Sequence, residues 1–324
     1  MPCGRTARTI PSCGLNCLMA EKVTDTDQKS RRTYLVGQTE IPARPLEPAL
    51  YLVATPIGNL GDITLRALET LAGADVVACE DTRVTRVLLA RYGIRQRATA
   101  YHEHNAAEAG PRLIDALASG RSVALVSDAG TPLVSDPGYR LVKQALERGL
   151  RVVPIPGASA VLAALTASGL PSDAFFFAGF LPVKNGQRRM RLEDLKNIPA
   201  TLIFFESPRR LGASLTAMEA VLGGRDAAVA RELTKTFEEM RTGSLADLAA
   251  HYAEAPTPKG EIVVCVAPPG EDAEQTPADL DRLLKSLAKE MPASKAAAEA
   301  ARMTGRPKPE LYRRLLDLKG GSDG

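Results

Sequence analysis

Four short polar segments in the first half of the chain each follow an apolar run and hold residues that can contact a ligand. They are TPIGN at 55–59, EDTR at 80–83, SDAGTPLVSDPG at 127–138 and PGAS at 156–159. Carboxylates can bind a hydroxyl group or a positive charge, glycine lets the main chain approach a ligand closely, and proline fixes a turn. The third segment is the densest, and we interpret it as the centre of a binding site: within eleven residues it holds Asp128, Gly130, Pro132, Asp136, Pro137 and Gly138.

Two common nucleotide-binding signatures are missing from the sequence. No G-x-G-x-x-G follows the first apolar run, and no G-x-x-x-x-G-K-[ST] occurs, which disfavours dinucleotide and P-loop sites. His102 and His104 flank Glu103, but an i, i+2 spacing in a loop without a third ligand does not favour zinc. The sequence therefore predicts no metal site.

The elements that must position these segments alternate between strands and helices. Apolar runs at 50–54, 75–79, 122–126 and 151–155 predict buried strands, and helical spacing follows at 63–72, 84–92, 108–118, 139–148 and 160–167. This alternation predicts an α/β layer with mostly parallel strands. Ligands of such sheets bind beyond the carboxyl ends of the strands, so the four polar segments should meet at one edge.

The second half predicts another α/β domain, with more mixed strand directions. Its expected strands are 175–180, 201–205, 227–230 and 261–267, and its expected helices lie near 188–196, 208–222 and 245–253. Three further helices near 279–290, 294–303 and 309–318 form a tail, with Ser294 as an N-cap candidate and Gly305 as a C-cap candidate. The predicted division is a disordered extension 1–48, domains at 49–171 and 172–268, and a basic helix-turn-helix-like tail at 277–320. Met19 could be an alternative start of the chain.

Composition and charge limit the classes of function. The 324 residues contain no apolar run near the roughly 20 that span a bilayer, which predicts a soluble protein. Five scattered cysteines indicate no disulfide framework and favour a reducing compartment, the cytoplasm. Residues 282–319 hold ten Lys or Arg against four Asp or Glu, whereas 49–281 hold 24 against 28. The basic tail indicates contact with a polyanion, and a solvated helical tail is the alternative.

Seven motifs in order resemble one family. LYLVATPIGNLGDIT, EDTR, LVSDAGTPLVSDPG, IPGASA, FFESPRR, RELTKTFEE and KGEIVV together resemble the 16S rRNA (cytidine 2′-O)-methyltransferases of the tetrapyrrole methylase superfamily, over about residues 50–267. The resemblance implies two α/β domains with S-adenosylmethionine in the cleft between them, a small C-terminal helical tail, and a homodimer. It also implies methylation of a cytidine ribose in the decoding region of the small ribosomal subunit, without a metal or a membrane.

The resemblance also assigns residues to the cofactor. The Gly-Asp-Pro loop of the superfamily corresponds to Gly130-Thr131-Pro132, so this chain has Thr131 in place of the acid, with Asp128 nearby. Methyl transfer is an in-line displacement for which alignment supplies much of the rate. The expected cofactor contacts are Pro56, Asp128, Gly130, Thr131, Val134, Ser135, Ser159, Ala160, Phe205 and Gly260.

A ribose hydroxyl is a weak acid, so a base or an oriented acceptor should assist the reaction. Candidates are Glu80, Asp81, His102, Glu103 and Glu206, each of which could instead be a structural group, as Asp81 could be a helix N-cap. Phosphate binding dominates RNA affinity. Candidates for phosphate or ribose contacts, with intramolecular ion pairs as the alternative, are Arg83, Arg209, Arg210, Arg231, Lys235, Lys308, Arg313 and Arg314.

Two alternatives stay open at this point. One keeps the fold and the cofactor but methylates carbon on a tetrapyrrole, which the basic tail and the TPIGNLGDIT opening disfavour. The other is an assembly factor that binds S-adenosylmethionine and RNA without turnover. The run Phe175-Phe-Phe is interpreted as core or dimer interface.

Overall fold

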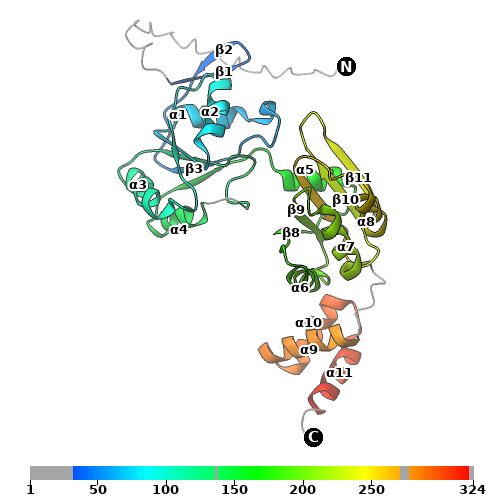
Figure 1. Ribbon diagram of the computed structural model, residues 1–324. Helices are drawn as coiled ribbons and strands as arrows, with labels where there is room; N and C mark the ends of the chain where they lie inside the picture. Colours follow the sequence, from blue (N-terminus) through cyan, green and yellow to red (C-terminus); the bar gives the residue numbers. More distant parts are fainter. Residues whose placement is uncertain (1–31, 136–137, 271–276, 321–324) are drawn as a thin grey trace, which may run out of the picture. The chain divides into compact units, whose positions relative to one another are not determined.

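The computed structural model describes residues 32–135, 138–270 and 277–320 (Figure 1). The chain divides into two compact units, one up to Ser159 and one from Ala160 onward. Each unit has its own five-stranded sheet, and the last three helices pack on one another. The two-domain α/β prediction with a helical tail is confirmed.

The sheet of the first unit is parallel throughout, in the order β5-β4-β6-β3-β7. Its strands are short apolar runs, and β6 is buried at every residue, as expected for a sheet covered on both faces. The bounds are β3 Leu50–Val53, β4 Val76–Cys79, β5 Ala98–Ala100, β6 Val123–Val126 and β7 Val152–Ile155. The sequence predicted all of these strands except β5, whose three residues are too few to show a pattern.

Helices cover both faces of this sheet. Alternate side chains of a strand point to opposite faces, so Ala124 and Val126 pack with α1 and α2 while Val123 and Leu125 pack with α3 and α4. These helices are α1 Leu65–Gly73, α2 Thr82–Arg91, α3 Ala106–Ala118 and α4 Tyr139–Glu147, with a short 3-10 helix, η2, at Leu60–Asp62.

The predicted disorder of 1–48 is wrong for the part of that segment that the structure describes, and residues 1–31, Met19 included, lie outside the described residues. Strands β1 (Thr33–Val36) and β2 (Thr39–Pro42) form an antiparallel hairpin. Tyr34 is buried in the core beside α1, and the main-chain N–H of Leu35 donates to the carbonyl of Tyr92 at 2.8 Å. The hairpin is held by tertiary packing, which local composition does not reveal.

The boundary predicted at residue 171 lies too late in the chain. Helix α5 (Ala160–Ala167) packs on the second sheet, where Val161, Ala164 and Leu165 contact a cluster that includes Ile203 and Val263. The helix is apolar on nearly all sides, so its pattern does not indicate which sheet it covers. The division therefore falls at 159/160, before the helix.

The sheet of the second unit has the order β11-β10-β12-β9-β8 and mixed directions, which confirms that prediction. Only β8 and β9 run parallel, and the other pairs are antiparallel. Helix α5 covers one face, while α6, α7 and α8 cover the other (Figure 1). The bounds are β8 Phe175–Phe180, β9 Thr201–Glu206, β10 Asp226–Arg231, β11 Glu239–Ser244, β12 Ile262–Val266, α6 Asn185–Leu195, α7 Leu211–Leu222 and α8 Leu245–Glu254.

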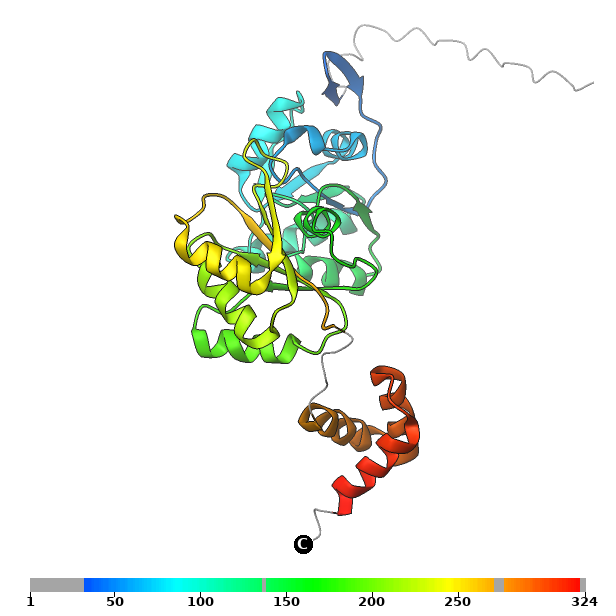
Figure 2. The ribbon, with the colours of Figure 1, turned by 90° about the vertical axis from the view of Figure 1, so that its right-hand side faces the viewer.

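The tail consists of α9 (Pro277–Glu290), α10 (Ala293–Thr304) and α11 (Lys308–Gly320), drawn in orange to red in Figures 1 and 2. Leucines of α9 and α11 enclose the small alanines of α10 in a separate apolar core. Gly305 has φ +68° and ends α10 through a left-handed cap, as predicted. Ser294 is not the N-cap, because the helix begins one residue earlier and Pro292 takes that position.

Candidate functional site

Five loops gather at the carboxyl edge of the first sheet, one after each strand. In the order of the sheet they begin at Tyr101, Glu80, Ser127, Ala54 and Pro156. The described residues of all four polar segments therefore lie at one edge, and the segment 101–105 joins them because it follows β5. Asp136 and Pro137 lie outside the described residues. The site is built by the parallel sheet, which brings together loops that begin as far apart in the chain as Ala54 and Pro156.

The loops after β3 and β6 are joined main chain to main chain. The N–H of Thr55 donates to the carbonyl of Gly130 at 2.9 Å, and the N–H of Gly130 donates to the carbonyl of Thr55 at 3.0 Å. The Thr55 hydroxyl also donates to the carbonyl of Ser127 at 2.9 Å. Thr55 belongs to the polar segment 55–59, but no pattern in that segment predicted this bridge. A threonine directly after a buried strand is too common a sequence pattern to predict such a bridge.

The loop after β6 is held in a costly backbone conformation. Leu133 and Ser135 have φ of +72° and +63°, and Gly130 has φ +80°. Residues other than glycine rarely adopt this region, at a cost of about 1–3 kcal/mol each, and such strain clusters at ligand sites. Thr131 donates its hydroxyl to the carbonyl of Ala158 at 3.3 Å, which links the same loop to the one after β7. Thr131, Val134 and Ser135 are exposed.

Asp128 and Asp81 connect the loops after β6 and β4. An oxygen of the half-buried Asp128 carboxylate accepts from the main-chain N–H of Asp81 at 2.9 Å. Asp81 is the N-cap of α2, because its carboxylate accepts from the N–H of Arg83 at 2.8 Å. The guanidinium of Arg83 lies 2.6 Å from the same carboxylate, and these hydrogen bonds lower the pKa of Asp81 to about 2. So acidic a carboxyl group is a poor proton acceptor, and the N-cap alternative explains Asp81.

His102 presents a buried nitrogen without a partner. Its Nδ1 has no hydrogen bond among the residues that the structure describes. The His102 and His104 rings meet edge to face, with centroids 6.1 Å apart. Asn105 fixes the turn, because its side chain accepts from the N–H of His102 at 2.8 Å and donates to the carbonyl of Ala100 at 2.9 Å. Glu80 is half-buried and interacts with another group of the protein, and Glu103 is exposed.

Glu206 and Arg210 form a structural cluster in the second unit. The buried Glu206 carboxylate accepts from the Ser214 hydroxyl at 2.5 Å and from the N–H of Ser207 at 2.7 Å, and Arg210 lies 3.4 Å from it. The Arg210 guanidinium also donates to the carbonyls of Leu181 and Pro182. Both carboxylate oxygens are engaged inside the unit, so the geometry favours the structural alternative for Glu206 and Arg210.

Two of the three expected cofactor residues of the second unit, Ala160 and Phe205, lie on its α5 side. Ala160 and Phe205 border the apolar cluster between α5 and the sheet, and the Phe205 ring packs edge to face on Phe177 with centroids 4.8 Å apart. Gly260 precedes β12 with φ +99°, and a Cβ there would lie 2.3 Å from the Glu232 carboxylate. Only glycine fits this position beside Glu232.

The basic residues predicted to bind RNA fall into two groups. Arg231 is 3.0 Å from Glu239, Lys235 is 2.7 Å from Glu232, and Arg314 is 2.5 Å from Asp281, which joins α11 to α9. These residues, with Arg83 and Arg210, form intramolecular ion pairs, which were the expected alternative to contacts with phosphate or ribose. Within the described part of the chain, no ion pair or hydrogen bond engages the exposed side chains of Arg209, Lys308 and Arg313.

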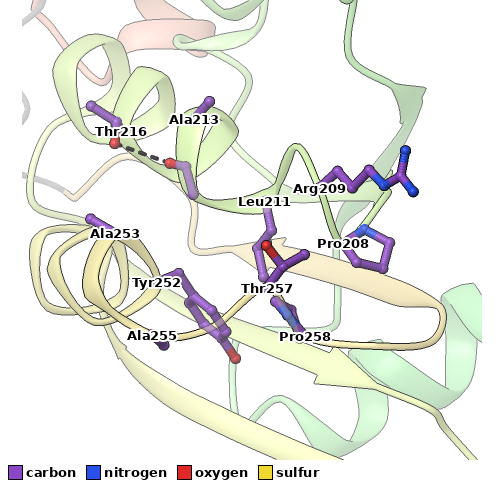
Figure 3. A pocket seen from close by; sticks show the side chains of 11 residues that line it. Pro208, Arg209, Leu211, Ala213, Thr216, Tyr252, Ala253, Ala255, Thr257 and Pro258 are labelled. Carbon is purple, nitrogen blue, oxygen red and sulfur yellow. Dashed lines mark hydrogen bonds between the residues drawn. The ribbon is translucent and has the colours of Figure 1, made fainter.

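A cavity of about 320 Å³ opens on the second unit, where the start of α7 meets the end of α8 (Figure 3). Pro208, Arg209, Tyr252 and Pro258 contribute to its wall, and the Arg209 side chain extends away from α7. None of the residues expected to bind the cofactor lines it. In the described part of the chain, no cluster of His, Cys, Asp and Glu could hold a metal ion, and no helix is long and apolar enough to cross a membrane.

Comparisons with known proteins match both parts of the chain. Residues 49–249 match the family model Tetrapyrrole (Corrin/Porphyrin) Methylases, and residues 274–319 match RsmI C-terminal HTH domain. A protein of Mesorhizobium japonicum named ribosomal RNA small subunit methyltransferase I is 76% identical over 90% of this chain and 100% of its own length. Proteins of the same name from Vibrio cholerae and Escherichia coli O157:H7 are 50% and 48% identical, each over 84% of this chain and 96% of their own.

Solved structures share the fold at low identity. A cobalt precorrin-4 methyltransferase matches with a TM-score of 0.51 and 19% identity, over 68% of this chain and 95% of its own. A diphthine synthase matches with a TM-score of 0.54 and 20% identity, over 68% of this chain and 90% of its own. At these identities the likeness shows the fold alone.

Proposed function

The chain belongs to the ribosomal RNA small subunit methyltransferase I family, within the tetrapyrrole methylases, and from that premise we propose its reaction. It methylates the ribose 2′-oxygen of a cytidine in the decoding region of 16S rRNA, with S-adenosylmethionine as the methyl donor. The observation that carries this proposal is the 76% identity to a relative over that relative's full length, with the tail included. A small-subunit substrate places the reaction in the cytoplasm.

A tetrapyrrole substrate is not proposed. The structures of corrin and porphyrin methylases share the fold, but their identity to this chain is far below that of the rRNA methyltransferases. The same relatives favour an enzyme over an assembly factor without turnover.

The loops at the carboxyl edge of the first sheet fit the proposed cofactor. S-adenosylmethionine supplies an electrophilic methyl group on a positively charged sulfur, and its other groups require donors, acceptors and a carboxylate. The half-buried Asp128 carboxylate and the exposed hydroxyls of Thr131 and Ser135 offer such groups. Gly130 lets two loops meet closely, because a Cβ there would lie 3.2 Å from Ile57 Cγ2. Pro56, Val134, Ser159, Ala160, Phe205 and Gly260 complete the proposed contact set.

His102 is the proposed base. Asp81 is too acidic, and both oxygens of Glu206 are engaged inside the second unit. The His102 imidazole has a buried nitrogen without a partner, and a polar atom left in that state costs free energy until a ligand satisfies it. A neutral imidazole accepts the proton that the ribose hydroxyl releases as the oxygen takes the methyl group. Glu80, from the neighbouring loop, is the second candidate.

The base assignment is tested with a matched pair of variants. His102→Gln should lower kcat by about 10²–10⁴-fold, the range that general bases contribute, without weakening cofactor binding. His104→Gln changes an exposed neighbour and should leave kcat near that of the wild type. Methyl transfer to small subunits and calorimetric titration of S-adenosylmethionine measure the two effects. Equal rates for both variants would contradict the assignment of His102.

RNA binding is proposed for Arg209, Lys308 and Arg313, whose charges are available to phosphates.

A homodimer is also proposed, through the edge strand β8. Strand β8 is at the edge of the sheet formed by the described residues, and its Phe175, Phe176 and Phe180 side chains are exposed. An uncovered apolar edge is a surface that a second copy can bury.

A further inference from the structure

A loop of the second unit presents one aromatic ring to solvent. Residues 232–238 connect the antiparallel strands β10 and β11, whose last pair is Arg231 with Glu239. Phe237 is 71% exposed, among the most exposed of the large apolar side chains. An exposed aromatic ring offers a flat apolar face on which a planar ligand can stack.

Main-chain hydrogen bonds hold this loop in a fixed shape. The N–H of Lys235 donates to the carbonyl of Glu232 at 3.0 Å, and that of Glu238 donates to the carbonyl of Lys235 at 3.1 Å. The N–H of Thr234 donates to the Glu238 carboxylate at 2.5 Å. Glu232 and Thr234 have φ of +51° and +66°, a conformation that residues other than glycine keep only when their surroundings impose it. The ring is therefore carried by a braced loop.

The base of the loop lies against a residue of the proposed cofactor set. The Glu232 carboxylate accepts from the N–H of Glu261 at 3.0 Å, and Lys235 bridges Glu232 and Glu261 at 2.7 and 3.2 Å. These hydrogen bonds place the Glu232 side chain over Gly260, where a Cβ would clash with it. The loop that carries Phe237 thus begins beside Gly260.

The surroundings of Phe237 suit a nucleobase better than a protein partner. Its chain neighbours Thr236 and Glu238 are exposed and polar. Protein interfaces require extended patches, whereas a base stacks on a single ring face. Single-stranded segments of RNA are recognised by stacking on aromatic side chains.

We propose that Phe237 stacks on an unpaired base of the RNA substrate and orients the target nucleotide. The inference rests on the proposed function, since it takes RNA as the substrate. Stacking on an aromatic ring strengthens binding by roughly 5- to 150-fold per base. Phe237→Ala should therefore lower kcat/KM for small subunits by a factor in that range, whereas Phe237→Tyr should retain activity. Phe237→Leu keeps an apolar side chain without a ring and should resemble Phe237→Ala.

The chain contains no tryptophan, which allows a direct test of stacking. Phe237→Trp introduces a single tryptophan, and a short single-stranded oligoribonucleotide that contains cytidine should quench its emission. Met190→Trp, at a position 69% exposed on α6, is the matched control and should not respond. Absence of quenching in Phe237→Trp, or equal quenching in both variants, would overturn the proposal. A change in oligomeric state in Phe237→Ala would overturn it too, because it would assign the ring to a protein contact.

Methylation assays of the wild type and of Phe237→Ala separate this inference from the proposed function. If the wild type fails to methylate small subunits, the proposed function fails whatever the fluorophore reports. If the wild type methylates them and Phe237→Ala does so with unchanged kcat/KM, only the stacking inference fails.

Discussion

Thr55 and Gly130 exchange two main-chain hydrogen bonds, of 2.9 and 3.0 Å, across 75 residues of sequence. The bridge holds the loop after β3 against the loop after β6, at the edge where the cofactor is proposed to bind. Gly130 has φ +80°, and a Cβ there would lie 3.2 Å from Ile57 Cγ2, closer than an ordinary contact. The bridge therefore depends on glycine for both its conformation and its close approach.

Gly130→Ala should weaken S-adenosylmethionine binding by at least tenfold. Gly120→Ala is the matched control, because Gly120 has φ +82° but a Cβ there meets nothing within 4 Å. Both variants carry the cost of a left-handed alanine, about 1–2 kcal/mol, and only Gly130→Ala disturbs the bridge. Calorimetric titration compares the two. Equal losses of affinity would show that the bridge does not shape the cofactor site.

The N-cap of α2 should contribute to stability down to strongly acid pH. The Arg83 hydrogen bonds lower the pKa of Asp81 from 3.8 to about 2, so the folded state favours the charged carboxylate. Its contribution is complete above about pH 5 and is lost as the pH falls toward 2. The difference in Tm between the wild type and Asp81→Asn should be constant above pH 5 and should shrink below pH 4. A difference independent of pH over this range would contradict the assignment.

Glu206 should matter for stability rather than for catalysis. Glu206→Gln replaces an acceptor of the Ser214 hydroxyl with an amide and should lower the free energy of unfolding by about 1–3 kcal/mol. Well below its Tm, the variant should keep the kcat of the wild type. Glu254→Gln changes an exposed carboxylate of the same unit and serves as the control. A large loss of kcat with unchanged stability would return Glu206 to the candidate bases.

Variants of the tail should distinguish residues that contact RNA from residues that form structural ion pairs. Lys308→Ala and Arg313→Ala should each weaken binding to small subunits and should each reduce the slope of log affinity against log salt by about 1. Arg314→Gln breaks the pair with Asp281 and should lower the Tm of the tail while leaving that slope unchanged. Salt titrations and thermal melts distinguish the two groups. An unchanged slope in all three variants would mean that the tail does not contact phosphate.

Much of the site could be predicted because it depends on the order of strands and polar segments along the chain. Short apolar runs specify buried parallel strands, and the loops after them must meet at one edge. Strand β5 has only three residues and β11 is a half-exposed polar edge strand, so neither shows the expected pattern. Because β11 was not predicted, the loop 232–238 that carries Phe237 was not predicted either.

The partners of individual charged residues could not be predicted, because they depend on tertiary neighbours. Glu206 looks like a candidate base in sequence, and only the fold reveals that Ser207 and Ser214 engage its oxygens. Arg314 lies in a basic segment, yet Asp281, 33 residues earlier, takes its charge. Helix α5 was assigned to the wrong domain because nearly all of its side chains are apolar.

The most direct test is methyl transfer from labelled S-adenosylmethionine to small subunits from a strain that lacks the modification, followed by nucleoside analysis. The proposed function predicts that label appears in a single 2′-O-methylated cytidine, and that His102→Gln abolishes most of the transfer. Label on a base, on another nucleotide or on no RNA, with the cofactor still bound, would contradict the proposed reaction.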